Sequence, residues 1–140
     1  MTHAPDGKKV ILSIDDIPSN LIAIKKILEP IFDVRLVKDE EQALTLLKRE
    51  KVDLILLDIE MPKYNGFELL QVIRQDPALA RIPVIFVTTH TSPSFTRRAT
   101  EAGAQGYILK PFKPSLLIQQ VLEQLDLDKP TACQDNTYSL

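Results

Sequence analysis

The chain carries the stretch VDLILLD at residues 52–58, a nearly continuous run of apolar side chains that ends in an aspartate. Such a run is typical of a strand that is buried on both faces of a parallel sheet. Similar apolar runs occupy residues 10–14 and 84–87. The less apolar run at residues 34–37 predicts an edge strand, and residues 107–109 are a short fifth candidate.

Segments with helical periodicity fill the gaps between these runs. Apolar residues recur at three- and four-residue spacing within residues 21–31, which predicts a helix with one apolar face. Pro18 suits the first turn of this helix, and Pro30 ends the segment. Asp39 and Asn65 each stand three residues before a glutamine or a glutamate, as in the capping box that opens a helix. Two more helices are predicted to begin after Ser92 and at Pro114.

Five strands that alternate with five helices predict an α/β fold, a single doubly wound (βα)5 domain with a five-stranded parallel sheet. Five strands suit the order 2-1-3-4-5, which places the first and third strands side by side. We expect the domain to span residues 8–125. Residues 126–140 are polar and aperiodic, and we interpret them as a C-terminal tail.

Composition excludes several classes of protein. The 140 residues carry a formal net charge of -2 without a basic block, so nothing indicates that the chain binds nucleic acid directly. The single cysteine, Cys133, cannot form an intramolecular disulfide and fits a reducing compartment. The N-terminus has no signal-peptide pattern, and no apolar run is long enough to span a membrane. We therefore expect a cytoplasmic protein that does not enter membranes.

Acidic residues follow two of the predicted strands. Asp15 and Asp16 come after the first strand, and Asp58 ends the third. Because these strand ends meet at one edge of the sheet, the three carboxylates should repel one another unless a cation lies among them. Mg²⁺ binds through a few carboxylates, waters and phosphate oxygens. The alternatives are that Asp15 or Asp16 merely caps the following helix and that Asp58 caps a turn.

Two further residues stand at the same predicted edge. Lys110 follows the fifth strand, and its point charge suits a phosphoryl oxygen. Thr88 ends the fourth strand, and its hydroxyl can donate to such an oxygen, although a threonine there also suits a strand. Together with Asp58, whose carboxylate can attack phosphorus, these residues predict a metal-assisted phosphoryl reaction.

Four motifs, in this order and spacing, resemble the receiver domain of response regulators in two-component signal transduction. They are VILSIDD at 10–16, VDLILLDIEMPKYNGFEL at 52–69, IPVIFVTT at 82–89 and GAQGYILKPF at 103–112. The resemblance covers the chain from about Lys8 to Leu125. No single motif is specific, but the combination is.

The resemblance implies a role for each matching residue. Asp58 would be the phospho-acceptor. The ligands of Mg²⁺ would be the carboxylates of Asp15, Asp16 and Asp58 together with the backbone carbonyl of Glu60.

The remaining roles concern the phosphoryl group and the response to it. Thr88 and Lys110 would contact the phosphoryl group, and Tyr107 would be the switch residue that turns inward with Thr88. The peptide bond between Lys110 and Pro111 would be cis. The output surface would run from the helix after the fourth strand to the last helix.

The resemblance also implies partners. The phosphoryl group would come from a phosphohistidine on a sensor histidine kinase or a phosphotransfer protein, or from a small donor such as acetyl phosphate. The signal would pass to an unidentified downstream protein, and a homodimer that forms on phosphorylation is a further option. The chain would be a stand-alone switch, since it carries no effector domain, or a piece of a longer protein.

Two departures from the family pattern concern the lifetime of the phosphoryl group. The position after Thr88 is usually very small in the family, whereas here it is Thr89, whose bulk would narrow access to the phosphoryl group. Glu60 and His90 each stand two residues beyond a site residue, Asp58 and Thr88. We expect both side chains to flank the path of the attacking water and to set how long phosphorylation lasts.

Two other functions compete with the switch. One is a Mg²⁺-dependent phosphatase that uses an aspartyl phosphate, since Glu60 is a carboxylate two residues after Asp58, as in Asp-x-Asp phosphatases. The other is a degenerate receiver that binds partners without phosphorylation. The YILKPF and IPVIFVTT contexts argue against the first, and the full set of key residues argues against the second. We therefore expect a switch with at most self-phosphorylation and auto-dephosphorylation activity.

Overall fold

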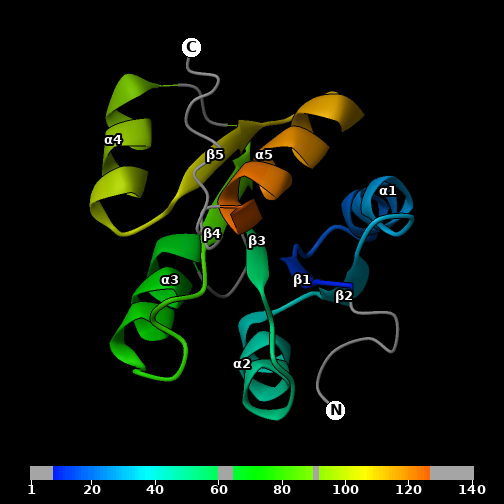
Figure 1. Cartoon of the computed structure of the whole chain (residues 1–140). Coiled ribbons are helices and arrows are strands. Elements are labelled where there is room, and N and C mark those ends of the chain that lie inside the picture. The colour runs from blue at the N-terminus through cyan, green and yellow to red at the C-terminus, as the bar shows by residue number, and fades with distance from the viewer. Residues whose placement is uncertain (1–7, 60–64, 90–91, 127–140) are drawn as a thin grey trace.

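The computed structural model of the protein describes residues 8–59, 65–89 and 92–126. Strands and helices alternate along the chain, as the sequence predicts (Figure 1). The elements are β1 (Val10–Ile14), α1 (Pro18–Leu28), β2 (Asp33–Val37), α2 (Glu40–Arg49), β3 (Leu54–Asp58), α3 (Gly66–Gln75), β4 (Val84–Thr88), α4 (Pro93–Glu101), β5 (Gly106–Leu109) and α5 (Pro114–Asp126).

The five strands form one parallel sheet in the order β2-β1-β3-β4-β5, which confirms the predicted topology. Helices α1 and α5 cover one face of the sheet, and α2, α3 and α4 cover the other (Figure 1). The arrangement is the flavodoxin-like doubly wound fold, in which β1 and β3 lie side by side at the switch point. None of the helices in the described part of the chain has the length and apolar character needed to cross a membrane.

Burial on two faces explains why the central strands read as unbroken apolar runs. In β1, Leu12 packs into the core beneath α2 and α3, whereas Ile11 packs into the core beneath α1 and α5. All five residues of β1, β3 and β4 are buried. In β2 only Val37 is buried, because this strand lies at the edge of the sheet. The mixed composition of residues 34–37 therefore reflects the position of the strand.

Helix boundaries agree with the sequence except at the end of α1. Asn65 and Glu68 form the predicted capping box. Asp39 is the N-cap of α2, as predicted, but the side chain of Gln42 accepts from the backbone of Lys38 and so does not complete a box with Asp39. The helix predicted within residues 21–31 ends at Leu28, so Ile31 lies in the following turn with 40% of its surface exposed. The neighbouring Phe32 is buried in its place, because the chain is no longer helical beyond Leu28 and the helical spacing no longer decides which side chain faces the core.

Arg74, near the end of α3, links three segments on the α3 side of the sheet. Its Nε and Nη2 donate to the carbonyl of Gly103 at 3.1 and 2.8 Å. Its Nη1 donates to the carbonyls of Ala80 and Ile82 at 3.2 and 2.8 Å. Its Nη2 also donates to Oε1 of Gln105 at 2.8 Å. All five N–H groups of the guanidinium therefore have an acceptor, and the end of α4 is tied to the α3–β4 connection.

A variant that removes these donors tests the link. We expect Arg74→Met to lower the free energy of unfolding by roughly 2 kcal/mol or more, because several carbonyls lose a charged hydrogen-bond donor. Urea unfolding followed by circular dichroism measures the change. Arg81 is exposed and makes no hydrogen bond or ion pair within the described residues, so Arg81→Met is the matched control. Equal losses in the two variants would contradict the assigned role.

Candidate functional site

Four strands deliver polar side chains to one edge of the sheet. Asp15 follows β1, Asp58 ends β3, Thr88 ends β4 and Lys110 follows β5. Because β1 and β3 are neighbours, Asp15 and Asp58 lie beside each other. The exposed fractions of Asp15, Asp58 and Thr88 are only 2%, 6% and 1%, which is unusual for polar residues. The residues predicted from sequence therefore converge on one buried site.

Three carboxylates crowd together there. One oxygen atom from each of Asp15, Asp16 and Asp58 lies within 4.8 Å of the others. The ammonium of Lys110 lies 3.1 Å from Oδ2 of Asp15 and 3.5 Å from Oδ1 of Asp58. One lysine beside three acids leaves an excess of negative charge in a largely buried space. Clustered carboxylate oxygens are the ligands that a hard divalent cation such as Mg²⁺ takes, so the residues fit this ion.

Asp15 is held by donors from three places. Its Oδ1 accepts from the backbone N–H of Ile17 at 2.9 Å, and its Oδ2 accepts from Nδ2 of Asn20 at 3.1 Å in addition to Lys110. The contact with Ile17 closes a turn directly before α1. The N-cap of α1 is Ile17 and no side chain caps this helix, so the alternative that Asp15 caps the following helix was wrong. Asn20 is absent from the residues predicted from sequence. Its position five residues after Asp15, in the first turn of a predicted helix, was the available signal.

The backbone around Lys110 and Asp58 fixes the direction of both side chains. The N–H of Lys110 donates to the carbonyl of Thr88 at 2.7 Å, and the peptide between Lys110 and Pro111 is cis, as the resemblance implied. Behind Asp58, the N–H of Gly66 donates to the carbonyl of Ile59 at 2.7 Å. A Cβ atom on Gly66 would lie 2.7 Å from Cα of Ile59 and 2.8 Å from the carbonyl oxygen of Asp58. Only glycine therefore lets α3 begin so close to the end of β3.

Tyr107 on β5 ends a row of aromatic rings that joins four elements. Its ring lies 6.1 Å from that of Phe95 on α4, and Phe95 lies 5.3 Å from Phe67 on α3. Phe67 in turn lies 5.1 Å from Phe86 on β4. Burial raises the pKa of the Tyr107 hydroxyl, and a hydrogen bond with the side chain of Thr96 partly offsets this. The ring predicted to act as a switch therefore contacts α4 directly.

Arg98 on α4 makes a cation–π contact with this row of aromatic rings. The guanidinium carbon of Arg98 lies 4.4 Å from the centre of the Phe67 ring. Attraction between the guanidinium and the ring face adds to the packing of α4 on α3. Neither Phe67 nor Phe95 was predicted as a site residue, because both read as ordinary apolar positions on helices.

Of the three residues predicted to set the phosphoryl lifetime, the structure describes only Thr89. Thr89 directly follows Thr88 and is exposed, and its predicted role stays a prediction. Glu60 and His90 lie outside the described residues.

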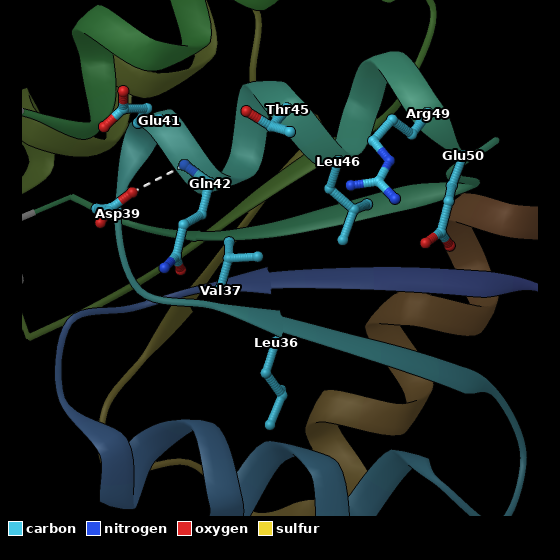
Figure 2. A pocket seen from close by; sticks show the side chains of 9 residues that line it. All are labelled: Leu36, Val37, Asp39, Glu41, Gln42, Thr45, Leu46, Arg49 and Glu50. Atoms are coloured by element: carbon cyan, nitrogen blue, oxygen red, sulfur yellow. Dashed lines mark hydrogen bonds between the residues drawn. The ribbon is translucent and has the colours of Figure 1, made fainter.

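A groove of about 590 Å³ lies between the edge strand β2 and helix α2 (Figure 2). Its lining includes Val37, Gln42 and Leu46, and the hydrogen bond from the backbone of Gln42 to Asp39 crosses one end. Charged side chains of both signs line it, so its chemistry favours no single class of ligand.

Comparison with known proteins agrees with the geometry. Residues 11–122 match the response regulator receiver domain. The chain belongs to this family. Among curated members, protein RcaC of Microchaete diplosiphon is 34% identical over 122 residues, which cover 86% of this chain and 19% of RcaC. The curated relatives that this receiver domain matches are longer proteins, of which the matched region makes up between 16% and 50%.

Solved receiver structures share the fold. The chemotaxis protein CheY4 of Vibrio cholerae superposes with a TM-score of 0.79 at 27% identity, over 83% of this chain and 98% of that chain. The receiver domain of the sensor histidine kinase PA1611 from Pseudomonas aeruginosa was solved with a magnesium ion coordinated in its active-site cleft. Its TM-score is 0.75 at 30% identity, over 84% of this chain and 97% of that chain.

Crowding of the carboxylates predicts an effect on stability. We expect Asp58→Asn to raise the free energy of unfolding on the order of 1 kcal/mol in the presence of a chelator, because it removes one of three mutually repelling charges. Urea unfolding at pH 7 in EDTA measures this gain. Glu101→Gln removes an exposed carboxylate on α4 and should change stability by less than about 0.5 kcal/mol. A loss of stability in Asp58→Asn would refute the repulsion argument.

Proposed function

We propose that this receiver domain, residues 8–125, is a phosphorylation switch that accepts a phosphoryl group on Asp58. The donor would be a phosphohistidine on a sensor histidine kinase or a phosphotransfer protein. The observation that carries this proposal is the convergence of Asp15, Asp16, Asp58 and Lys110 at the carboxyl edge of the sheet. Residues 126–140 would be a tail, and the cytoplasm would be the location.

Asp58 is suited to act as the nucleophile. Its carboxylate is fixed at the end of a buried strand. The absence of a side chain on Gly66 lets the start of α3 pack directly against the backbone of Asp58 and Ile59. A carboxylate oxygen of Asp58 would attack phosphorus, the phosphorus–nitrogen bond of the donor would break, and the leaving imidazole would take up a proton. The product is an acyl phosphate on Asp58. Such a transfer needs alignment and neutralised charge more than further covalent chemistry.

The acidic cluster would hold Mg²⁺. The protein ligands would be the carboxylates of Asp15, Asp16 and Asp58 and the backbone carbonyl of Glu60, which lies outside the described residues. When bound, the ion neutralises charge on the transferring phosphoryl oxygens and on the clustered carboxylates. The magnesium ion named for the related PA1611 receiver supports this assignment.

Lys110 and Thr88 would hold the phosphoryl group after transfer. The ammonium of Lys110 already lies 3.5 Å from Asp58, so a short movement would bring it to a phosphoryl oxygen. The Thr88 hydroxyl would donate to another oxygen, and Tyr107 would follow it because its ring packs on α4. The altered face of α4, β5 and α5 would then bind a downstream protein. A homodimer of phosphorylated chains is one form that this output would take.

Mass spectrometry tests the proposal directly. Incubation with acetyl phosphate and Mg²⁺ should add one phosphoryl group to the intact chain. The adduct should be absent from Asp58→Asn and from a sample treated with EDTA, since the first lacks the nucleophile and the second lacks the cation. Addition to Asp58→Asn at the wild-type level would exclude Asp58 as the acceptor.

A wild type without an adduct would leave two cases, which beryllofluoride separates. Binding of this phosphoryl mimic would indicate a short-lived acyl phosphate, whereas no binding would indicate a degenerate receiver. Sustained turnover of a phosphate ester would indicate a phosphatase instead of a switch.

The lifetime of the phosphoryl group should depend on residues at the mouth of the site. We expect Thr89→Ala to raise the rate of dephosphorylation several-fold, because a smaller side chain admits water. Thr45→Ala, on the exposed face of α2, is the control and should leave the rate unchanged. We propose that Glu60 and His90 also set this rate, and unchanged rates in Glu60→Asn and His90→Ala would remove them from the mechanism. The decay of the phosphorylated mass after removal of the donor measures all four variants.

A further inference from the structure

We propose that Asn20 is a positioning residue for the cation site, whose side-chain amide keeps the Asp15 carboxylate directed at a divalent cation. The inference rests on the proposed function and deepens it. Three donors hold Asp15 in the structure, and Asn20 is the only one of them that comes from the side chain of a helix.

The contacts of Asp15 divide between its two oxygens. Oδ1 accepts from the N–H of Ile17 at 2.9 Å, a backbone contact within the same turn. Oδ2 accepts from Nζ of Lys110 and from Nδ2 of Asn20, both at 3.1 Å. Since Asp15 is only 2% exposed, solvent cannot replace a donor that leaves. The direction of the second oxygen therefore depends on Lys110 and Asn20 alone among the donors of the described residues.

Lys110 cannot hold Asp15 and a phosphoryl group equally well. Its ammonium is shared between Asp15 at 3.1 Å and Asp58 at 3.5 Å, and it sits on a flexible stem. In the proposed reaction it turns to a phosphoryl oxygen on Asp58. Asn20 then becomes the remaining side-chain donor to Asp15.

Asn20 lies in a rigid part of the fold, so its side chain can stay in place while Lys110 turns to the phosphoryl group. It lies in the first turn of α1, which opens on Pro18, and its backbone N–H donates to the carbonyl of Ile17 at 3.0 Å. The next residue, Leu21, is buried in the core and fixes the orientation of this turn. The amide is thus presented from a rigid element, as an outer-shell group that orients a metal ligand should be.

The chemistry of an amide also fits this position. The neutral amide of Asn20 donates a hydrogen bond to the Asp15 carboxylate without adding a positive charge that would repel a cation. A fourth carboxylate in place of Asn20 would increase the crowding of Asp15, Asp16 and Asp58, and an apolar side chain would leave Oδ2 without this donor. The asparagine orients the ligand and leaves the charge of the site unchanged.

A competing interpretation is that Asn20 only fastens the start of α1 to the end of β1. The two interpretations differ in what its removal changes. A purely structural contact affects the stability of the cation-free protein and leaves the affinity for Mg²⁺ as it was. A positioning contact affects the affinity for Mg²⁺, whatever its loss does to the stability of the cation-free protein.

The experiment compares Asn20→Ala and Asn20→Leu with wild type, with Ser19→Ala as the control. Ser19 is exposed in the same turn, and its side chain makes no hydrogen bond within the described residues. Isothermal titration with MgCl2 gives the dissociation constant, and thermal unfolding in EDTA gives the stability. We expect the Mg²⁺ dissociation constant to rise roughly tenfold or more in both Asn20 variants. Ser19→Ala should match wild type in both measurements.

A second readout separates positioning from catalysis. The rate of phosphorylation by acetyl phosphate is measured against Mg²⁺ concentration for wild type and Asn20→Ala. The half-saturating Mg²⁺ concentration should rise about as much as the dissociation constant, whereas the rate at saturating Mg²⁺ should stay close to that of wild type.

Each outcome bears on the inference. An unchanged Mg²⁺ dissociation constant in both Asn20 variants, with or without a lower unfolding temperature, would overturn it and leave the proposed function intact. A wild type that neither binds Mg²⁺ nor gains a phosphoryl group would overturn the proposed function and the inference together. The wild-type samples therefore distinguish the two failures.

Discussion

Repulsion among three carboxylates is the constraint on which the site depends. Parallel strands bring Asp15, Asp16 and Asp58 to one edge, where oxygens from the three side chains lie within 4.8 Å of one another. A sheet can hold such a group only where counter-charge and hydrogen-bond donors surround it. The surrounding structure supplies them through Lys110 from β5, the N–H of Ile17 and the amide of Asn20. The rigid apolar core beneath the sheet keeps these groups in register, because β1 and β3 are buried on both faces.

Most of the fold can be predicted from the sequence because burial on two faces leaves an unmistakable pattern. Strands such as residues 54–58 are apolar throughout, and the edge strand β2 is not, so even the position in the sheet can be inferred. The prediction fails where the chain leaves a periodic element. Ile31 continues the helical spacing of α1 but lies in a turn, and the apolar spacing alone does not distinguish it from the buried Leu28. Pro30, which cannot continue a helix, is the local signal that separates the two.

Some residues of the candidate site can be predicted from the sequence, and others cannot. Asp15, Asp58, Thr88 and Lys110 stand at strand ends, so the topology alone brings them together. Arg74 and the rings of Phe67 and Phe95 could not be identified in advance, because their importance arises from contacts between elements far apart in sequence. Asn20 lies only five residues from Asp15, so its position in the first turn of a predicted helix was a signal that the sequence analysis did not use. An apolar or amide side chain on a helix has many possible partners, and only the packed structure selects one. Glu60 and His90, two of the residues predicted beside the site, lie outside the described residues.

The hydrogen bonds of Arg74 hold one end of α4 more firmly than the other. Its last turn is fastened to the body of the protein through the carbonyl of Gly103, which lies on the α3 side away from the acidic cluster. Its first turn begins at Ser92, only a few residues beyond Thr88. A rigid helix that is held at one end and displaced near the other rotates about the held end. A force applied near Ser92 would therefore displace the first turn of α4, where Phe95 meets Tyr107, more than the end that Arg74 holds.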